Sequence, residues 1–542
     1  MKRTNLLNVF AVILAMSVTG CGKSSGGGGE YDPDKANLYI ITYEGGVGDQ
    51  WIKNAAKIFE EKNKDRTDFE EGKTGVKVHV KSGPVGGTSL LNTDLDQDIY
   101  FTESIDYYGM TNRNKMADIT DVVTASNPED DNKKIIDKID TNMVNFMNRG
   151  NKYYAVPFYD CFYSLLYDKD LFREQKLYMK DDGSWTNKVS EFGTGPNGVS
   201  GDWDDGLPKT YAQFGTLLDM MRNKNIIPFV YVVNPEMSFY SSRTLMSYWA
   251  DDEGFDDANL NYTFDGTAHH IVTSISGGVA QTEEVAISKN NGYLLRKQAG
   301  LYNALSFADK ILCSTTANYQ GSSTFKTAQK EFVANKYIGG SVKPYGMIFE
   351  GTWFENEARD AFDFARSFDP EAEFNFGIMP IPKSNDSKVG QKATFLNLNE
   401  SYGFINAKSK QMKLAKEFFS FVHTDEQLRA FTVETGMTRA LDYSLTSAQY
   451  AAASTFTKDL ISIKQSEHVN ILYPCSGLDF VINNSSTFTT QNWLWSTNGD
   501  QYNKNPVMEF IDANSSVTSE QYFWSHVADI DQEKWNRIIK AN

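Results

Sequence analysis

The first hundred residues alternate between two hydrophobic patterns. A β-rich run covers residues 38–43, and apolar residues at helical spacing follow over residues 52–59. Residues 76–80 then alternate apolar and polar side chains, and we expect another buried strand over residues 98–102. Strand and helix periods in this order are typical of β-α-β units, whose strands form a largely parallel sheet. The sequence therefore predicts an α/β fold.

Later segments carry helix-end signals. Thr210 with Gln213, and Thr424 with Gln427, each pair a capping hydroxyl with a glutamine three residues later, ahead of an apolar helical stripe. Gly436 follows the second stripe and suits a left-handed helix end. These signals predict helices that begin near residues 211 and 425.

Composition excludes several function classes. The chain has 542 residues, of which 40% are hydrophobic, so it is long enough for two or more packed units. Its formal charge of −17 argues against binding to nucleic acid, because phosphates require a basic protein surface. The six histidines show no zinc spacing, and the acidic cluster over 202–205 lacks the downstream glutamate of a calcium loop. We expect no nucleic acid, no metal and no cofactor.

The N-terminus has the pattern of a secretory signal. Lys2 and Arg3 precede an apolar run over residues 6–16, which is too short to span a bilayer. The sequence Val-Thr-Gly-Cys that ends at Cys21 resembles the lipobox of bacterial lipoproteins, which implies a signal peptide over 1–20 and lipidation at Cys21. The glycine-rich residues 21–36 would then be a flexible tether to the outer face of the cell membrane. An uncleaved membrane anchor is the alternative.

The other cysteines do not form a disulfide framework. Beyond Cys21 the chain has only Cys161, Cys313 and Cys475. An odd set in an exported protein allows at most one disulfide and leaves at least one thiol free. Cys161 lies in an apolar run and is interpreted as a small buried hydrophobic residue. Whether Cys313 and Cys475 pair stays open.

Several segments together resemble a known family. The order of these segments is similar to that of the extracellular solute-binding proteins of sugar ABC importers, which include the maltose-binding proteins. The segments that carry the resemblance are 43–46, 152–157, 165–172, 350–353, 376–382 and 401–405. This chain departs from the family pattern in having Asp168 where Asn is usual, and Thr438-Arg439 where a proline commonly follows.

The resemblance implies a fold and a function. It implies a two-lobe, periplasmic-binding-protein-like α/β fold of type II with a hinge of several crossings. Lobe one would comprise 37–160 and 380–438, and lobe two would comprise 161–379 and 439–542. It further implies a monomeric binding protein, not an enzyme, that captures a carbohydrate such as an oligosaccharide between the lobes and delivers it to ABC permease subunits.

Candidate polar ligand-binding residues lie at strand ends and crossings. Glu44 and Glu103 follow strands of lobe one, where a carboxylate can accept two adjacent sugar hydroxyls, although both also fit a solvated loop. Asp160 lies at the first crossing implied by the resemblance and fits the cleft wall or the hinge equally well. Glu400 precedes a family-like strand and Arg439 lies at the third crossing, and either could instead form a hinge salt bridge.

Aromatic candidates follow from sugar chemistry, because C–H faces stack on flat rings. Trp353 matches the stacking position of the resembled family, with inter-strand core packing as its alternative. Tyr159 lies beside Asp160 at the first crossing. The remaining aromatic candidates belong to lobe two and are Tyr240, Trp249, Trp493 and Trp495. Trp493 and Trp495 alternate as on one strand face, which edge packing explains as well.

Three other functions stay open from the sequence. A surface lectin would hold a glycan without a transporter, and a glycoside hydrolase also has clustered aromatics and paired acids. A binding protein for peptides or other polar solutes is the third, because a fold does not fix the chemistry of the ligand.

Overall fold

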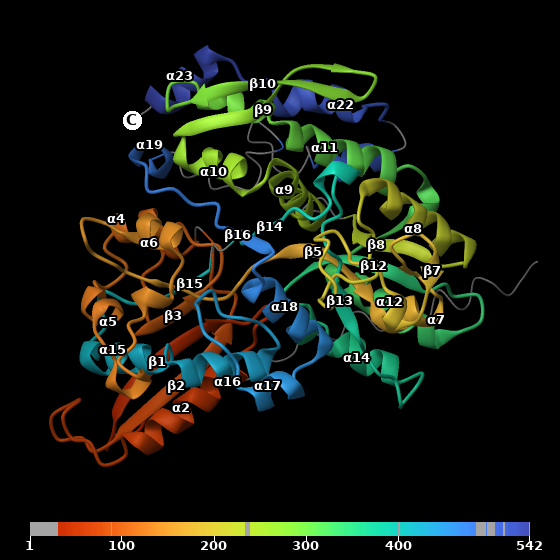
Figure 1. Ribbon diagram of the computed structural model, residues 1–542. Helices are drawn as coiled ribbons and strands as arrows, with labels where there is room; N and C mark the ends of the chain where they lie inside the picture. Colours follow the sequence, from red (N-terminus) through yellow and green to blue (C-terminus); the bar gives the residue numbers. More distant parts are fainter. Residues whose placement is uncertain are drawn as a thin grey trace, which may run out of the picture.

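The structure is a computed structural model that describes residues 31–87, 89–233, 239–398, 401–483, 495, 505–512 and 515–540. The predicted signal peptide and Cys21 lie outside the described residues. Two mixed sheets with helices on both faces form two lobes (Figure 1). No helix among the described residues is both long and apolar enough to cross a membrane.

The first sheet forms the core of lobe one. Its strand order is β2-β1-β3-β15-β4. β1 runs parallel to β2 and β3, and Ile40 pairs with Val80 on one side and Ile99 on the other. β15 lies between β3 and β4 and pairs with both in the antiparallel sense. The predicted parallel opening is therefore confirmed. The strand bounds are β1 Ala36–Tyr43, β2 Val76–Gly83, β3 Ile99–Thr102, β4 Val156–Pro157 and β15 Tyr402–Ile405.

Helices from the N-terminal part of the chain and from residues 412–435 cover this sheet (Figure 1). In the helix over residues 50–62, the predicted apolar stripe is buried, with Phe59 packed edge-on against Phe418 at 5.1 Å. The helices of lobe one are α2 Gln50–Lys62, α3 Ser89–Asn92, α4 Tyr107–Asn112, α5 Thr120–Thr124, α6 Thr141–Met147, α15 Met412–Phe421 and α16 Asp425–Thr435.

The second sheet forms the core of lobe two. Its order is β11-β8-β12-β5-β13, with β8 parallel to β11 and β12, and β5 antiparallel to β12 and β13. All of β12 is buried, so both faces of this strand are covered. The strand bounds are β5 Tyr163–Asp168, β8 Ile227–Val232, β11 Tyr319–Ser322, β12 Tyr345–Gly351 and β13 Phe376–Ile378.

The helices around the second sheet include the predicted capped ones. Thr210 accepts a hydrogen bond from the Gln213 N–H at the start of α8, and Thr424 accepts one from Gln427 at the start of α16. Gly436 ends α16 with a φ of 74°. All three helix-end predictions are confirmed. The helices near this sheet are α7 Lys169–Glu174, α8 Tyr211–Asn223, α9 Phe239–Glu253, α11 Ala299–Phe307, α12 Phe325–Ile338, α13 Phe354–Glu357, α14 Arg359–Arg366, α17 Ser447–Ala452 and α18 Thr455–Gln465.

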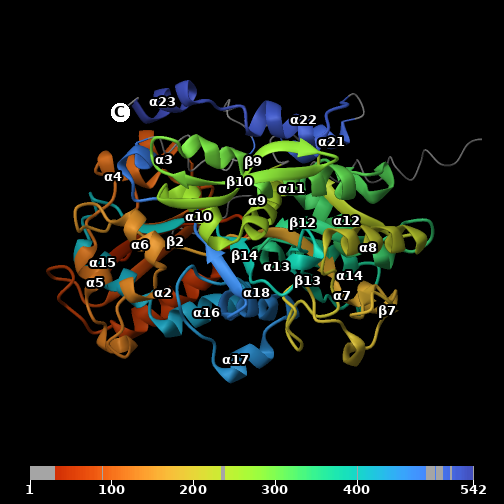
Figure 2. The same ribbon diagram turned by 45° about the horizontal axis from the view of Figure 1, so that its top comes forward.

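A long hairpin caps lobe two. β9 (Gly266–Ser276) pairs with β10 (Val279–Ile287), and C-terminal helices lie beside the hairpin in both views (Figures 1 and 2). A small separate core lies under it, comprising Leu260, Phe264, Ala268, Ile271, Ile287, Leu295, Phe480, Val481, Ile530 and Trp535. The elements around it are α10 Phe255–Thr263, α19 Asp479–Ile482, α21 Pro506–Ile511, α22 Ser519–Tyr522 and α23 Gln532–Lys540. β6 (Tyr178–Met179) and β7 (Trp185–Thr186) form a further short hairpin.

A two-stranded unit lies between the lobes. β14 (Ala393–Leu396) runs parallel to β16 (Val469–Leu472), and Figure 1 places both between the two larger sheets. β14 falls in the range predicted for lobe one, yet it pairs with β16 and not with the lobe-one sheet. The last hundred residues therefore contribute to the junction as well as to the cap.

Candidate functional site

A hollow of about 370 Å³ lies where the two lobes meet. Lobe one, lobe two and the crossing segments all supply lining side chains. The lining residues are Tyr43, Gly45, Glu103, Ser104, Cys161, Tyr163, Phe239, Tyr240, Arg243, Phe325, Trp353, Glu357, Leu398 and Ser401. Four predicted ligand-binding residues adjoin or line it, since Tyr159 contacts Glu103 and the other three line it directly.

Lobe one contributes the loops that follow two parallel strands. Tyr43 is the last residue of β1, and Glu103 follows β3. The Tyr159 hydroxyl donates a hydrogen bond of 2.5 Å to Glu103 Oε1, which fixes that carboxylate at the wall. Burial raises the pKa of the Tyr43 hydroxyl, and the nearby Glu103 carboxylate raises it further. Tyr43 therefore stays protonated and can donate.

Lobe two contributes a wall of aromatic rings. Trp353 meets Tyr163 edge-on at 4.9 Å and Tyr240 at 6.0 Å. Phe239 stacks on Tyr240 at 4.9 Å with an interplanar angle of 14°. Such a cluster fixes ring orientations and presents flat apolar surface next to polar groups.

The indole of Trp353 is placed by two glycines. A Cβ at Gly351 would lie 2.3 Å from the indole, and a Cβ at Gly46, where φ is 69°, would lie 2.7 Å from the Trp353 Cβ. Gly46 belongs to lobe one, and its carbonyl accepts a hydrogen bond of 2.7 Å from Asn356 of lobe two. Trp353 is 6% exposed and lines the hollow, so it lies at the contact between the lobes.

Charged groups of lobe two reach the same space. The Arg243 guanidinium lies over the Phe239 ring at 4.2 Å and donates to the Tyr163 hydroxyl. Glu357 Oε2 accepts a hydrogen bond of 2.8 Å from Gln329, and the same amide nitrogen donates to Glu350 at 2.9 Å. Burial raises the pKa of Glu357, and Lys326 lowers it. The hollow therefore combines carboxylates, a guanidinium, hydroxyls and rings.

Asp160 is not at the hollow, which corrects its prediction as a ligand contact. It is fully buried at the junction, where it accepts hydrogen bonds from Asn397 at 2.7 Å, Thr438 at 2.6 Å and Lys464 at 2.8 Å. These partners come from the other segments that pass between the lobes. The hinge alternative therefore holds for Asp160.

Arg439 is also a hinge residue and not a ligand contact. It is fully buried, its Nε donates to the Phe158 carbonyl, and its Nη2 lies 2.9 Å from His423 Nε2. His423 Nδ1 lies 2.6 Å from the Phe419 carbonyl, so Nδ1 carries the proton and Nε2 accepts from Arg439. Burial, and then Arg439, lower the pKa of His423 well below its ordinary value. The arrangement fixes the third crossing in lobe one.

Three further predicted residues do not line the hollow. Trp249 is 0% exposed on α9, and its Nε1 donates to Gln298 at 3.2 Å. Trp495 is buried, and its Nε1 donates to the Ser242 carbonyl at 2.9 Å. Glu44 is exposed and is not among the lining residues, although its neighbours Tyr43 and Gly45 are. Glu400 and Trp493 lie outside the described residues.

Sequence reasoning missed several lining residues. Tyr163 flanks the first predicted crossing and Ser401 begins the family-like segment 401–405, but nothing local separates them from core residues. Arg243 lies three residues after Tyr240 on α9, a spacing that puts both on one helix face, and Glu357 lies four residues after Trp353. Their helical spacing from Tyr240 and Trp353 is the signal in the sequence that points to Arg243 and Glu357.

Among the described residues that line the hollow, no cluster is suited to a metal. Two groups of His, Asp and Glu side chains in the described part of the chain are close enough to hold an ion, but neither lines the hollow. Its donors are carboxylates and hydroxyls set beside rings, which is an arrangement suited to binding a polar ligand with apolar faces.

The chain belongs to the bacterial extracellular solute-binding protein family, whose model matches residues 48–428. This family comprises binding proteins that act outside the cytoplasm, which confirms the predicted class. No curated protein matches the chain at a significant level.

Solved structures confirm the two-lobe fold. The GacH receptor of Streptomyces glaucescens, solved unliganded and with acarbose, is 12% identical with a TM-score of 0.53, over 93% of this chain and 99% of that chain. A mannobiose-bound ABC transporter binding protein from Bifidobacterium animalis subsp. lactis is 13% identical with a TM-score of 0.52, over 94% and 95%. The cyclic α-maltosyl-1,6-maltose binding protein of Arthrobacter globiformis is 11% identical with a TM-score of 0.51, over 94% and 100%.

Proposed function

We propose that this protein is the substrate-binding component of an ABC importer and holds a carbohydrate, such as an oligosaccharide, in the hollow between its lobes. The observation that carries the proposal is the meeting of Trp353 and Tyr240 with Glu103, Glu357 and Arg243 in one inter-lobe space. Rings stack on the C–H faces of a sugar, while carboxylates and the guanidinium bind its hydroxyls. Similar structures solved with acarbose and mannobiose support the ligand class.

Binding would favour the closed arrangement of the lobes. A ligand that contacts both walls lowers the free energy of the closed form more than that of the open form. In the structure, the hydrogen bond from Asn356 to Gly46 also joins the two walls. A micromolar sugar would require about 8 kcal/mol of net binding free energy. No bond is broken in this cycle, so no general acid or base is needed.

The proposal includes the location and partners of the protein. A lipid on Cys21 would hold a monomer at the outer face of the membrane, and residues 21–36 would give it reach. The closed form would then deliver its sugar to the permease subunits. Labelling cells with a palmitate analogue tests the anchor, because Cys21→Ala should abolish the label.

A binding experiment tests the site. A thermal-shift screen of mono- and oligosaccharides should identify a ligand that raises the melting temperature, because such a ligand binds the folded state. Trp353→Ala should then weaken its affinity at least tenfold in calorimetry. Phe364→Ala is the matched control, since Phe364 is an exposed aromatic residue of the same lobe. Equal affinity of the Trp353 variant and the control would refute the assigned site.

Two of the three rival functions, the glycoside hydrolase and the lectin, make different predictions. A glycoside hydrolase would release new reducing ends from an oligosaccharide, whereas the proposed binder leaves it intact. A rigid lectin would bind without a change in solution scattering.

A second hollow of about 470 Å³ near α16 and α17 is a weaker sugar site, because none of its lining residues is aromatic.

A further inference from the structure

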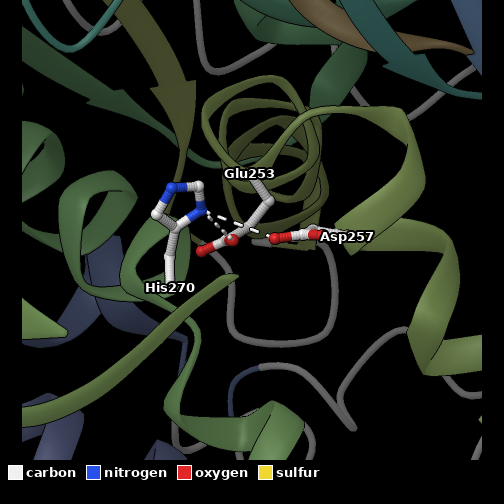
Figure 3. Close-up of side chains that lie close together, drawn as sticks. All are labelled: Glu253, Asp257 and His270. Atoms are coloured by element: carbon white, nitrogen blue, oxygen red, sulfur yellow. Dashed lines mark ion pairs between the residues drawn. The ribbon is translucent and has the colours of Figure 1, made fainter. Parts of the chain in front are cut away.

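Three side chains converge at the base of the β9–β10 hairpin, outside the inter-lobe hollow. Glu253 ends α9, Asp257 lies in the first turn of α10, and His270 lies on β9 (Figure 3). Gly254 separates the two helices with a φ of 81°, which favours glycine. The break at Gly254 lets the two carboxylates face the same imidazole.

The spacing of the three groups is too long for direct hydrogen bonds. His270 Nδ1 lies 3.6 Å from Glu253 Oε2 and 3.5 Å from Asp257 Oδ2. An N–H···O hydrogen bond is about 2.7–3.2 Å long. A tetrahedral zinc ion with bonds of about 2.0–2.2 Å holds its ligand atoms about 3.3–3.6 Å apart. The observed separations therefore match ligands around an ion better than partners of each other.

Glu253 provides an independent sign that a ligand belongs here. Its side chain is 1% exposed, and its Oε1 accepts a hydrogen bond from the Gly300 N–H. Its Oε2 forms an ion pair with His270 at 3.6 Å (Figure 3), but this buried oxygen has no hydrogen-bond partner. A buried carboxylate oxygen left unbonded is costly, and a cation at this point would remove that cost.

Neighbouring groups hold Asp257 in place. His269 Nδ1 lies 2.8 Å from Asp257 Oδ1, and the backbone N–H of His269 donates to Asp257 Oδ2 at 3.0 Å. Hydrogen bonds of this kind orient the ligands of a metal ion and tune their basicity. His270 is 49% exposed, so an ion and a water molecule can reach the cluster from solvent.

We propose that Glu253, Asp257 and His270 bind one Zn²⁺ ion, with water as the fourth ligand. An imidazole nitrogen with two carboxylates suits zinc, whereas calcium and magnesium favour all-oxygen sites. The ion would connect the α9–α10 junction to the hairpin and so stabilise the cap of lobe two. The alternative is a protonated His270 held between the carboxylates by charge alone.

Calorimetry with zinc chloride on tag-free, chelator-treated protein tests the proposal. The protein should bind one equivalent of Zn²⁺, which should raise its melting temperature. His270→Ala and Asp257→Asn should each weaken zinc affinity at least tenfold. His468→Ala is the matched control, because His468 is exposed and lies outside the cluster, and it should leave the affinity unchanged.

Anomalous diffraction at the zinc edge gives an independent reading on the unmodified protein. The ion should lie between Glu253 Oε2, Asp257 Oδ2 and His270 Nδ1. Zinc bound elsewhere, no one-to-one binding, or equal affinities of the His270 and His468 variants would overturn the proposal and leave the ion pair as the role of the cluster.

Discussion

Replacing Asp160 by alanine tests the hinge most sharply. The carboxylate accepts hydrogen bonds from Asn397, Thr438 and Lys464 at 2.6–2.8 Å, and it is fully buried. Hydrogen bonds to a charged group contribute about 1.5–3 kcal/mol each. Their sum overstates the loss, because Lys464 also donates to the carbonyls of Arg439 and Leu441. We expect Asp160→Ala to lower the free energy of unfolding by about 3–5 kcal/mol, as when a buried ion pair loses one partner.

Urea denaturation followed by tryptophan fluorescence measures this loss. Asp94→Ala is the control, because Asp94 forms an ion pair at 3.4 Å with both partners largely exposed, which contributes about 0–1 kcal/mol. Asp160→Asn keeps the size of the side chain and one carbonyl acceptor, so its effect should fall between the two. A loss below about 1 kcal/mol for Asp160→Ala would refute the assignment of this residue to the hinge.

Three further predictions follow from buried and inter-lobe contacts. Trp249→Ala should lower the free energy of unfolding by about 3–5 kcal/mol in urea denaturation, because the side chain is 0% exposed; a loss near zero would contradict its place in the core. Asn356→Ala removes the hydrogen bond to Gly46 and should increase the radius of gyration of the unliganded protein. An unchanged radius would contradict a role of this contact in holding the lobes together. Burial and then Glu357 raise the pKa of Glu350. The contribution of Glu350 to the free energy of unfolding is therefore fully present below the unfolded-state pKa of about 4.3, and it is lost as pH rises through the folded-state pKa. Glu350→Gln should therefore show a smaller fall in melting temperature than wild type as pH rises above 5, and identical slopes would contradict the shift.

Local patterns were enough to predict much of the fold. The alternation over residues 76–80 and the helical stripe over 52–59 each report a period that the chain itself carries, and both elements occur as predicted. Thr210 and Thr424 cap helices through bonds to residues three positions away, so the signal and its partner lie in one short segment. The pairing of β14 with β16 joins residues far apart, and no local pattern reports it.

The site was harder to predict, because burial depends on distant segments. Asp160 and Glu103 are both acids next to strands, yet one is enclosed by Asn397 and Thr438 and the other lines the hollow. Trp249 is an aromatic residue of the kind that stacks on sugars, but its side chain on α9 is buried in the core. Trp353 lines the hollow. Its family-like segment, and not a hydrophobic period, indicated this position.

Small-angle X-ray scattering with the saccharide identified by thermal shift tests the central claim most directly. Scattering profiles of the protein alone and with saturating sugar should differ, with a smaller radius of gyration in the complex, because the ligand joins the wall around Glu103 to the wall around Trp353. Identical profiles at saturation would contradict a ligand held between two lobes.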